Sequence, residues 1–294
     1  MKSKRFITIH AVILLAAIVT TVCILFRHGG EPVSRTGQNA EIRVDFIDVG
    51  KGDCILIRSG THTVLIDTGY KDTAGKVCAF LDSEDVSEIN TLLITHYDKD
   101  HIGGAEKLLS EYPVETIYLP DYDKDSKPFR KLMKAIQQKD SRVTRVSEET
   151  TFTAGHVTCS VMPSGVAYDA QKENDNDLSL LVTVVNGKDS FFFAGDIEKT
   201  GIRSFLDKNH RTCDVIKIPH HGRIESNSKA LQDSVKPSCA VITDDDENSA
   251  DSELCRLLES AGIEYYRTGE KGTVTVTGNG SGHYTIRTEK GQPS

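Results

Sequence analysis

The segment "LLITHYDKDHIGG", residues 92–104, contains the pattern that decides the fold and the chemistry expected of this chain. An apolar run ends at Thr95, and four potential metal ligands follow within six residues: His96, Asp98, Asp100 and His101. If the apolar run is a buried strand, these side chains lie at its carboxyl end, where loops carry chemistry. Gly103 and Gly104 allow close backbone packing as the next helix begins.

The spacing of these ligands favours two adjacent metal ions over a single ion. In extended backbone, residues two apart share a face, so His96 and Asp98 can point together. A turn at Asp100 and His101 then aims the next two side chains at a neighbouring point. The alternative is a polar loop whose aspartates cap a helix over residues 104–112. The apolar strand before the motif favours the metal interpretation.

Strand-like stretches rich in β-branched and aromatic residues recur after residue 41. They cover residues 42–49, 54–59, 63–68, 91–95, 116–119, 157–162, 178–185, 190–195, 214–218, 239–243, 263–268, 273–277 and 283–288. Helical spacing of apolar residues separates some of them, as at residues 77–81, 132–136, 202–206 and 254–258. This order predicts an α/β domain in which sheets pack together and helices lie outside.

The first 40 residues differ from the rest of the chain. Residues 6–26 contain no Asp, Glu, Lys or Arg, and as a helix they span roughly 31 Å, close to the hydrocarbon thickness of a bilayer. Basic residues precede them within residues 1–5, which predicts a cytoplasmic N-terminus and an exported remainder. A cleaved signal peptide is the alternative, but residues 27–37 offer no A-x-A-like site. Residues 27–40 are predicted to be a polar linker, and residues 41–290 a single domain.

The formal charge of the chain is −8, so composition indicates no broad basic face for nucleic acid. This does not exclude a local basic groove. The seven cysteines form no C-x-x-C motif and most lie in apolar stretches, which predicts buried free thiols in preference to a disulfide framework.

With these residues in view, "THYDKDHIGG" resembles the signature of the metallo-β-lactamase superfamily, usually H-x-H-x-D-H. Aspartate at the second ligand position resembles the branch that contains the hydrolase domain of the DNA-internalisation competence protein ComEC. Further similar stretches follow in the expected order: "DVGKGDC" (48–54), "VLIDTG" (64–69), "FFFAGDIE" (191–198), "IKIPHHG" (216–222) and "YRTGEKGTVTV" (266–276). The resemblance implies a four-layer αβ/βα sandwich preceded by one N-terminal transmembrane helix.

The resemblance also implies the ligands of two divalent metal ions. His96, Asp98 and Asp196 are expected to hold one ion. The bridging Asp196, together with Asp100, His101 and a histidine of "HHG", is expected to hold the other. His221 is taken as that histidine, with His220 as the alternative or as its neighbour. Asp100 is also the expected catalytic residue, because it could orient a water molecule and accept its proton. Asp67 is the best candidate for supporting the ligands from behind.

The chain departs from the superfamily pattern in ways that bear on metal and substrate. Where a further histidine is usual, residues 173–181 read "ENDNDLSLL", with Asn176 or Asp177 in its place. Ligation rich in oxygen shifts preference towards Mn²⁺, although Zn²⁺ remains open. The N-x-Y-G-H-P stretch of the branch is replaced by "DDDENSADSE" (244–253), and Arg223 stands where a serine is usual. Arg223 could hold a phosphate, although an exposed arginine is the simpler interpretation.

These observations predict a membrane-anchored, extracytoplasmic, metal-dependent hydrolase, and in particular a phosphodiesterase that acts on DNA by resemblance to ComEC. Two metal ions activate water and neutralise a phosphoryl group, which suits this reaction. A second hypothesis keeps the metals but changes the substrate to a cell-wall polymer, since residues 112–123 are similar to a loop of phosphorylcholine esterases. A third is a degenerate domain that binds metal without catalysis. If residues 6–26 are cleaved, the domain is secreted.

Overall fold

The computed structural model describes residues 41–169, 175–208 and 211–291. The predicted membrane segment, residues 6–26, and the predicted linker, residues 27–40, lie outside the described residues. Within the described ranges, no helix combines the length and apolar character that crossing a membrane requires.

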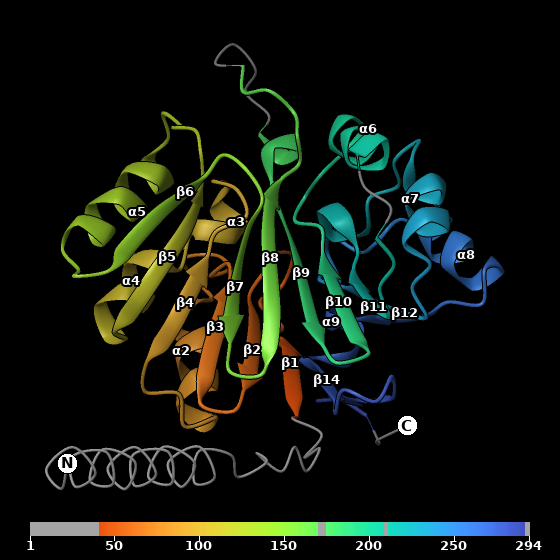
Figure 1. Ribbon diagram of the computed structural model, residues 1–294, viewed down its shortest axis with the longest axis horizontal. Coiled ribbons are helices and arrows are strands. Elements are labelled where there is room, and N and C mark those ends of the chain that lie inside the picture. The colour runs from red at the N-terminus through yellow and green to blue at the C-terminus, as the bar shows by residue number, and fades with distance from the viewer. Residues whose placement is uncertain (1–40, 170–174, 209–210, 292–294) are drawn as a thin grey trace, which may run out of the picture. The chain divides into compact units, whose positions relative to one another are not determined.

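Two β-sheets form the centre of the fold (Figure 1). Neighbouring strands of the first sheet are, in order, β15 (Tyr284–Thr288), β14 (Val274–Gly278), β1 (Ile42–Phe46), β2 (Ile55–Ser59), β3 (His62–Ile66), β4 (Ile89–Leu93), β5 (Val114–Pro120) and β6 (Arg142–Val146). Those of the second sheet are β13 (Glu264–Arg267), β12 (Cys239–Ile242), β11 (Val215–Lys217), β10 (Asp189–Phe193), β9 (Leu180–Asn186), β8 (Val157–Pro163) and β7 (Thr150–Ala154).

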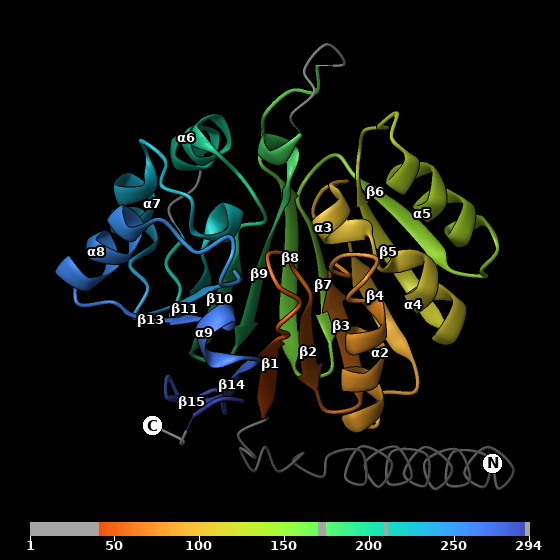
Figure 2. The same cartoon turned by 180° about the vertical axis from the view of Figure 1, so that it is seen from behind.

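Helices cover the outer face of each sheet, as Figures 1 and 2 show from opposite sides. The first sheet is covered by α2 (Ala74–Ser83), α4 (Ala105–Glu111) and α5 (Lys127–Gln137). The second is covered by α6 (Lys199–Lys208), α7 (Ser228–Val235) and α8 (Ser252–Ser260). Shorter elements are α3 (Lys99–Ile102), α9 (Thr268–Lys271) and the 3₁₀ turns η1 (Asn176–Leu178) and η2 (Pro219–Gly222).

Three apolar layers hold these elements together. Between the sheets, inward-facing residues of both sheets interlock, and the rings of Phe46 and Phe193 lie 6.0 Å apart. Outside the first sheet, Leu81 and Leu109 are fully buried beneath the helices. Outside the second, Phe205 of α6 stacks on Phe192 of β10 at 5.1 Å. This arrangement confirms the predicted α/β sandwich of two packed sheets with helices outside.

Two strands at adjoining edges of the sheets were not predicted. β6 reads "RVTRV" and leaves Val143 41% exposed, and β7 reads "TTFTA". Each lies at the edge of its sheet. Edge strands bury little apolar surface, so their sequences lack the apolar alternation that identifies a strand.

Each sheet combines antiparallel strands with a parallel set, and the parallel sets position the candidate ligands. In the first sheet β3 and β4 run parallel, and in the second β10, β11 and β12 do. His96 follows β4, Asp196 follows β10, and His221 follows β11. Carboxyl ends of parallel strands lie at one edge of a sheet, so residues distant in sequence converge there.

Candidate metal centre

Four carboxylate and imidazole side chains meet where these strands end, with one ligand atom of each within 4.8 Å of all the others: Asp100, His101, Asp196 and His221. All four are buried. Asp196 Oδ2 lies 3.2 Å from His101 Nε2 and 3.0 Å from His221 Nε2. Neighbouring ligands of one divalent ion lie roughly 3–3.6 Å apart, since each lies about 2.0–2.2 Å from the ion. The spacing of this four-residue cluster therefore suits a shared cation.

The unsatisfied atoms of the centre also fit a metal ion. Three buried imidazole nitrogens form no hydrogen bond with any described residue: Nε2 of His96, His101 and His221. Buried polar atoms are nearly always satisfied, so these three nitrogens are candidates to bind a cation. A divalent cation takes neutral imidazole nitrogens and carboxylate oxygens together.

His101 is held in the tautomer that a metal ligand needs. Its Nδ1 donates to Asp67 Oδ2 at 2.7 Å, because a carboxylate only accepts, and Nε2 is left to face Asp196. Asp67 follows β3 with a positive φ of 58° and also accepts from the backbone N–H and hydroxyl of Thr95. A carboxylate behind a ligating histidine fixes its ring and raises its basicity.

His221 reaches the cluster through strained backbone. It has φ 53° and follows His220 at φ 47°, a conformation that residues other than glycine rarely adopt. Its Nδ1 donates to the carbonyl of Thr243 at 2.8 Å, which again leaves Nε2 for a cation. Such strain is commonly stored at functional sites.

Asp196 lies between a buried lysine and the imidazoles. Gly195 has φ +53°, and a Cβ there would lie 2.7 Å from Ser179 Cβ, so only glycine fits before this carboxylate. Asp196 Oδ1 lies 3.2 Å from the ammonium of Lys217, and Oδ2 faces His101 and His221. Lys217, on β11, is completely buried and also pairs with Asp53 at 2.5 Å.

These charges shift the pKa values of the cluster. Burial alone would raise the pKa of Asp196, but His221, His101 and Lys217 lower it well below its usual value. Burial alone would lower the pKa of His101, but Asp196 and Asp67 raise it well above the usual value. The metal-free cluster therefore favours a carboxylate beside an imidazolium, and a cation displaces the imidazolium proton when it binds.

Asp100 is the member of the cluster nearest to solvent, at 7% exposure. Its Oδ2 lies 3.7 Å from His221 Nε2, 3.5 Å from the hydroxyl of Tyr70 and 4.0 Å from the ammonium of Lys51. This carboxylate can therefore face both a cation and a bound substrate.

The other predicted half of the centre is arranged differently. The ring of His96 lies 4.0 Å from that of His101, and its Nδ1 lies 3.2 Å from the hydroxyl of Thr95. Asp98, however, is 40% exposed and forms an ion pair with Lys124, which also pairs with Asp175. The close four-residue cluster therefore excludes His96 and Asp98. The expectation that His96 and Asp98 are ligands of a separate metal ion stays a prediction.

The remaining candidates lie around the centre. His220 contacts Glu198, with His220 Nδ1 3.4 Å from Glu198 Oε1, and Asn176 donates to the same carboxylate at 2.9 Å. Asp177 accepts from the backbone of residues 198 and 201, and so caps α6. Arg223 donates to Asp251 at 3.1 Å. Among the histidines of "HHG", the structure brings His221 to the cluster.

Sequence reasoning missed three supporting residues. The first two are Asp53 and Lys217, which are buried and form an ion pair. The signal was a lysine inside the apolar stretch "DVIKI", since a buried lysine needs a carboxylate partner. The third, Asp175, accepts from the hydroxyl of Tyr122 and pairs with Lys124, and it lies one residue before the predicted Asn176.

Comparison with known proteins agrees with this geometry. Residues 47–165 match the Metallo-beta-lactamase superfamily. This matched stretch is similar to metallo-β-lactamase domains. It is 25% identical over 258 residues to ComE operon protein 3 of Bacillus subtilis (strain 168), which covers 80% of this chain and 33% of that protein. It is 27% identical to Recombination protein 2 of Haemophilus influenzae, covering 68% of this chain and 24% of that protein. The chain thus spans about a third or less of the length of these relatives.

Solved structures show the same metallo-β-lactamase fold. The metallo-beta-lactamase fold protein YhfI from Bacillus subtilis has a TM-score of 0.56 at 12% identity, over 81% of this chain and all of that one. Zn²⁺-bound PqqB from Methylobacterium extorquens has a TM-score of 0.52 at 11% identity, over 77% of this chain and 97% of that one. At these identities the likeness establishes the fold alone.

Proposed function

We propose that this chain is a metal-dependent phosphodiesterase. The observation that carries the proposal is the convergence of His101 Nε2 and His221 Nε2, two imidazole nitrogens without a hydrogen-bond partner among the described residues, on the carboxylates of Asp196 and Asp100. A bound divalent ion lowers the pKa of water and neutralises charge on a phosphoryl oxygen. Asp196, Asp100, His101 and His221 are proposed to hold one ion. A second, bridged by Asp196 and held by His96 and Asp98, requires Asp98 to leave Lys124.

The residues around the cluster have separate proposed tasks. Asp100, the most exposed member, orients the attacking water and accepts its proton. Lys51 lies 4.0 Å from Asp100 and adds positive charge at the mouth of the site. Asp67 and Thr243 hold the two imidazoles by their Nδ1 atoms, so their Nε2 atoms stay directed at the ion.

DNA is the proposed substrate. The chain is similar to Recombination protein 2 and, at 24% identity, to Competence protein ComA of Neisseria gonorrhoeae, and these names support a nucleic-acid substrate. Mn²⁺ is the proposed ion, because Asp196 would serve both ions, so that the two ions together would receive four carboxylate ligations and three imidazole ligations. Residues 6–26 are proposed to anchor the domain, residues 41–290, outside the cytoplasmic membrane, or to be cleaved on secretion.

One assay tests the reaction and its substrate. The full chain, purified in detergent and loaded with Mn²⁺, is offered bis-p-nitrophenyl phosphate, single-stranded DNA and a choline phosphodiester in separate reactions. We expect the chain to hydrolyse bis-p-nitrophenyl phosphate and single-stranded DNA. This activity should be lost in His101→Ala and kept in His62→Ala. His62 is a matched control because it is exposed at the start of β3. Cleavage of the choline compound alone indicates the wall-directed alternative, and no cleavage by any metal-loaded chain indicates a non-catalytic domain.

A separate experiment tests the proposed location. External protease is added to intact protoplasts that express the full chain. Digestion of residues 41–290 is expected, and their protection contradicts an extracytoplasmic domain.

A further inference from the structure

A lysine-lined groove runs beside the metal centre, between the loop after β3, the helices α3 and α4, and α5. Two adjoining hollows of about 280 and 690 Å³ form it, and they share Lys71, Gly103, Glu106 and Lys131. Seven lysines line the lysine groove against three acids: Lys71, Lys99, Lys107, Lys127, Lys131, Lys134 and Lys139, with Asp72, Glu106 and Glu111. The groove is therefore positive on a chain whose formal charge is −8.

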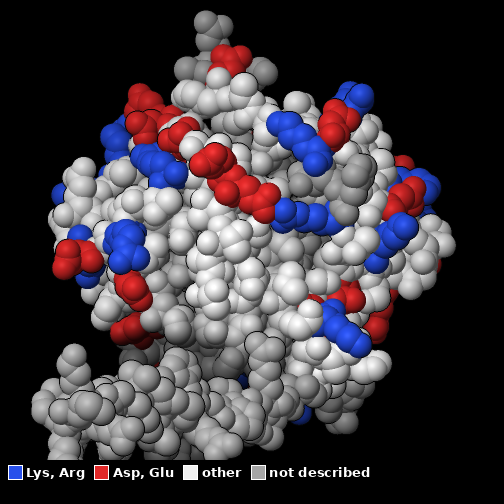
Figure 3. All heavy atoms as spheres, in the orientation of Figure 1, with Lys and Arg blue, Asp and Glu red and all other residues white. Residues whose placement is uncertain are grey.

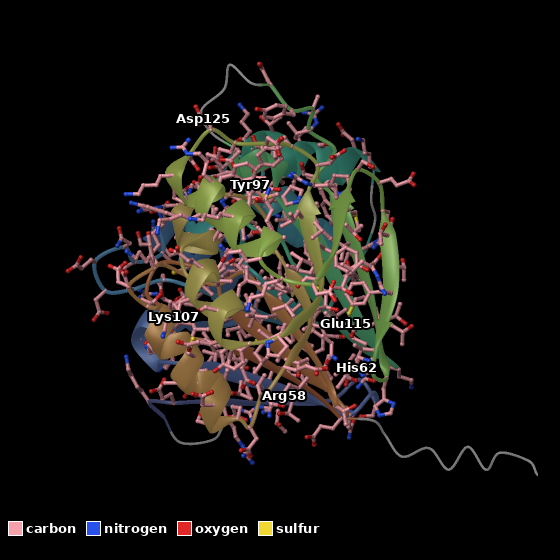
Figure 4. The ribbon with its side chains drawn as sticks, turned by 90° about the vertical axis from the view of Figure 1, so that its left-hand side faces the viewer. Arg58, His62, Tyr97, Lys107, Glu115 and Asp125 are labelled. Atoms are coloured by element: carbon pink, nitrogen blue, oxygen red, sulfur yellow. The ribbon has the colours of Figure 1, made fainter. Side chains whose placement is uncertain are left out.

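Most of this charge is available to a ligand. Lys107 pairs with Glu111 and Lys131 pairs with Glu106. The other five lysines of the groove form no ion pair with any described residue, and Lys71, Lys127 and Lys134 are exposed. Elsewhere the charges are mixed: on the described part of the face in Figure 3, basic and acidic residues are interspersed. Figure 4 views the molecule from the side on which α4 and α5 lie, and Lys107 is labelled there.

A close backbone contact positions two of the lysines of the groove, Lys71 and Lys99. A Cβ on Gly103 would lie 2.5 Å from the backbone nitrogen of Lys71 and 2.3 Å from the carbonyl oxygen of Lys99, so only glycine allows this contact. The contact fixes the loop that carries Lys71 against α3, which carries Lys99. Gly103 of the signature motif therefore shapes the groove.

The groove borders the segment that carries Asp100, because Tyr70 and Lys99 line it. Lys99 directly precedes Asp100, and its ammonium lies 5.9 Å from the ring centroid of Tyr70. The hydroxyl of Tyr70 lies 3.5 Å from Asp100 Oδ2. A chain whose reacting phosphate lies at Asp100 can therefore continue over Tyr70 into the lysine groove.

We propose that the lysine groove binds the phosphate backbone of single-stranded nucleic acid and leads it to the metal centre. This rests on the proposed function, because it identifies the polymer that the site hydrolyses. Lysines act on phosphates as point charges and do not read sequence. A single strand fits better than a duplex, because His101 and Asp196 are 0% and 2% exposed and the reacting phosphate must reach a recessed centre. The ring of Tyr70 offers a face on which a base can stack.

Binding of fluorescein-labelled oligo(dT) to the full chain in detergent, measured by anisotropy with EDTA present, tests this proposal without turnover. The groove variant carries Lys71→Gln, Lys127→Gln and Lys134→Gln. The control variant carries Lys188→Gln, Lys229→Gln and Lys290→Gln, which change three exposed lysines outside the groove and lower the formal charge equally. The groove variant is expected to bind roughly tenfold or more weakly, with a salt-dependence slope lower by about 2, whereas the control stays within about twofold.

Equal weakening in both variants overturns the proposal, because net charge then explains binding. Unchanged binding in the groove variant overturns it as well. If the chain binds a polyglycerol-phosphate chain but not oligo(dT), the ligand of the groove is a wall polymer and the nucleic-acid proposal is overturned. Hydrolysis of bis-p-nitrophenyl phosphate by the unaltered chain tests the reaction independently. If the chain does not hydrolyse bis-p-nitrophenyl phosphate but binds DNA through the groove, the proposed function alone is overturned. If the chain hydrolyses the compound but its DNA binding does not depend on the groove, the groove proposal alone is overturned.

Discussion

The pair His96 and Asp98 lies in the same segment after β4 as two members of the four-residue cluster, Asp100 and His101, yet the fold holds the pair and the cluster in different ways. Three of the four cluster residues have a partner behind them: Asp67 behind His101, Thr243 behind His221 and Lys217 behind Asp196. Around the pair, Asp98 turns towards Lys124 and is 40% exposed. The cluster is arranged for a cation before the cation binds, whereas the pair requires an ion pair to break first.

This difference has a consequence for metal loading. A ligand set held by its surroundings loses little conformational freedom on binding, so it binds more tightly than one that must rearrange. We therefore expect the first equivalent of metal to bind at the cluster and the second, weaker equivalent at His96 and Asp98.

The largest expected effect is a difference in metal binding between variants of two histidines that follow β4, His101 and His96. His101→Ala removes a ligand of the cluster and should abolish binding of the first equivalent of Mn²⁺, with a loss of more than about 100-fold in kcat. His96→Ala should keep the first equivalent and lose the second. Calorimetric titration of metal into the two chelator-treated variants measures this. Loss of both equivalents in His96→Ala contradicts the comparison.

The next effect concerns stability without metal. Lys217→Met leaves Asp53 and Asp196 buried without their cation, so the free energy of unfolding should fall by about 3–5 kcal/mol. Lys124→Met removes a lysine from the partly solvated Asp98 and from the buried Asp175, which still accepts from the Tyr122 hydroxyl, so the loss should be smaller, about 1–2 kcal/mol. Urea unfolding of both variants in EDTA gives the two values. Similar losses mean that both halves are held equally firmly.

The pH dependence of stability gives a third difference between the halves. The pKa of His101 is raised in the folded chain, so its contribution is complete below about pH 6.5 and is lost as pH rises towards the raised value. The metal-free chain should therefore lose up to about 1.4 kcal/mol per pH unit above pH 6.5. Burial and His101 lower the pKa of His96, so His96→Gln should keep this slope while His101→Gln removes it. Thermal unfolding between pH 6 and 9 supplies the data, and an unchanged slope in His101→Gln is evidence against this assignment.

The sequence predicts the parts of the molecule where apolar pattern and ligand type coincide. The strands that lead to His96, Asp196 and His221 have long apolar runs, and the sandwich follows from them. The edge strands β6 and β7 bury too little apolar surface to be recognised. Asp53 and Lys217 were missed because their partnership is tertiary, joining residues 164 positions apart in sequence.

The sequence did not predict the direction in which the side chains of the site point. Spacing of two places His96 and Asp98 on one face of an extended stretch, but α3 begins at Lys99 and directs Asp98 towards Lys124 of the loop after β5. Conversely, the choice between His220 and His221 depends on two consecutive positive φ angles. Such angles are set by packing around the turn and have no signature in a histidine pair.

The smallest expected effect tests whether Lys124 limits the second equivalent of metal. Lys124→Met releases Asp98 and Asp175 from a partly exposed ion pair worth roughly 0.2–1 kcal/mol, so the dissociation constant of the second Mn²⁺ should fall by up to about fivefold. The first equivalent should be unaffected, since Lys124 is bonded to carboxylates outside the four-residue cluster. Lys188→Met serves as the control, because it removes one exposed lysine elsewhere. If the second Mn²⁺ binds more weakly without Lys124, the lysine orients Asp98 for the ion instead of competing with it, and the two halves of the centre are then prepared alike.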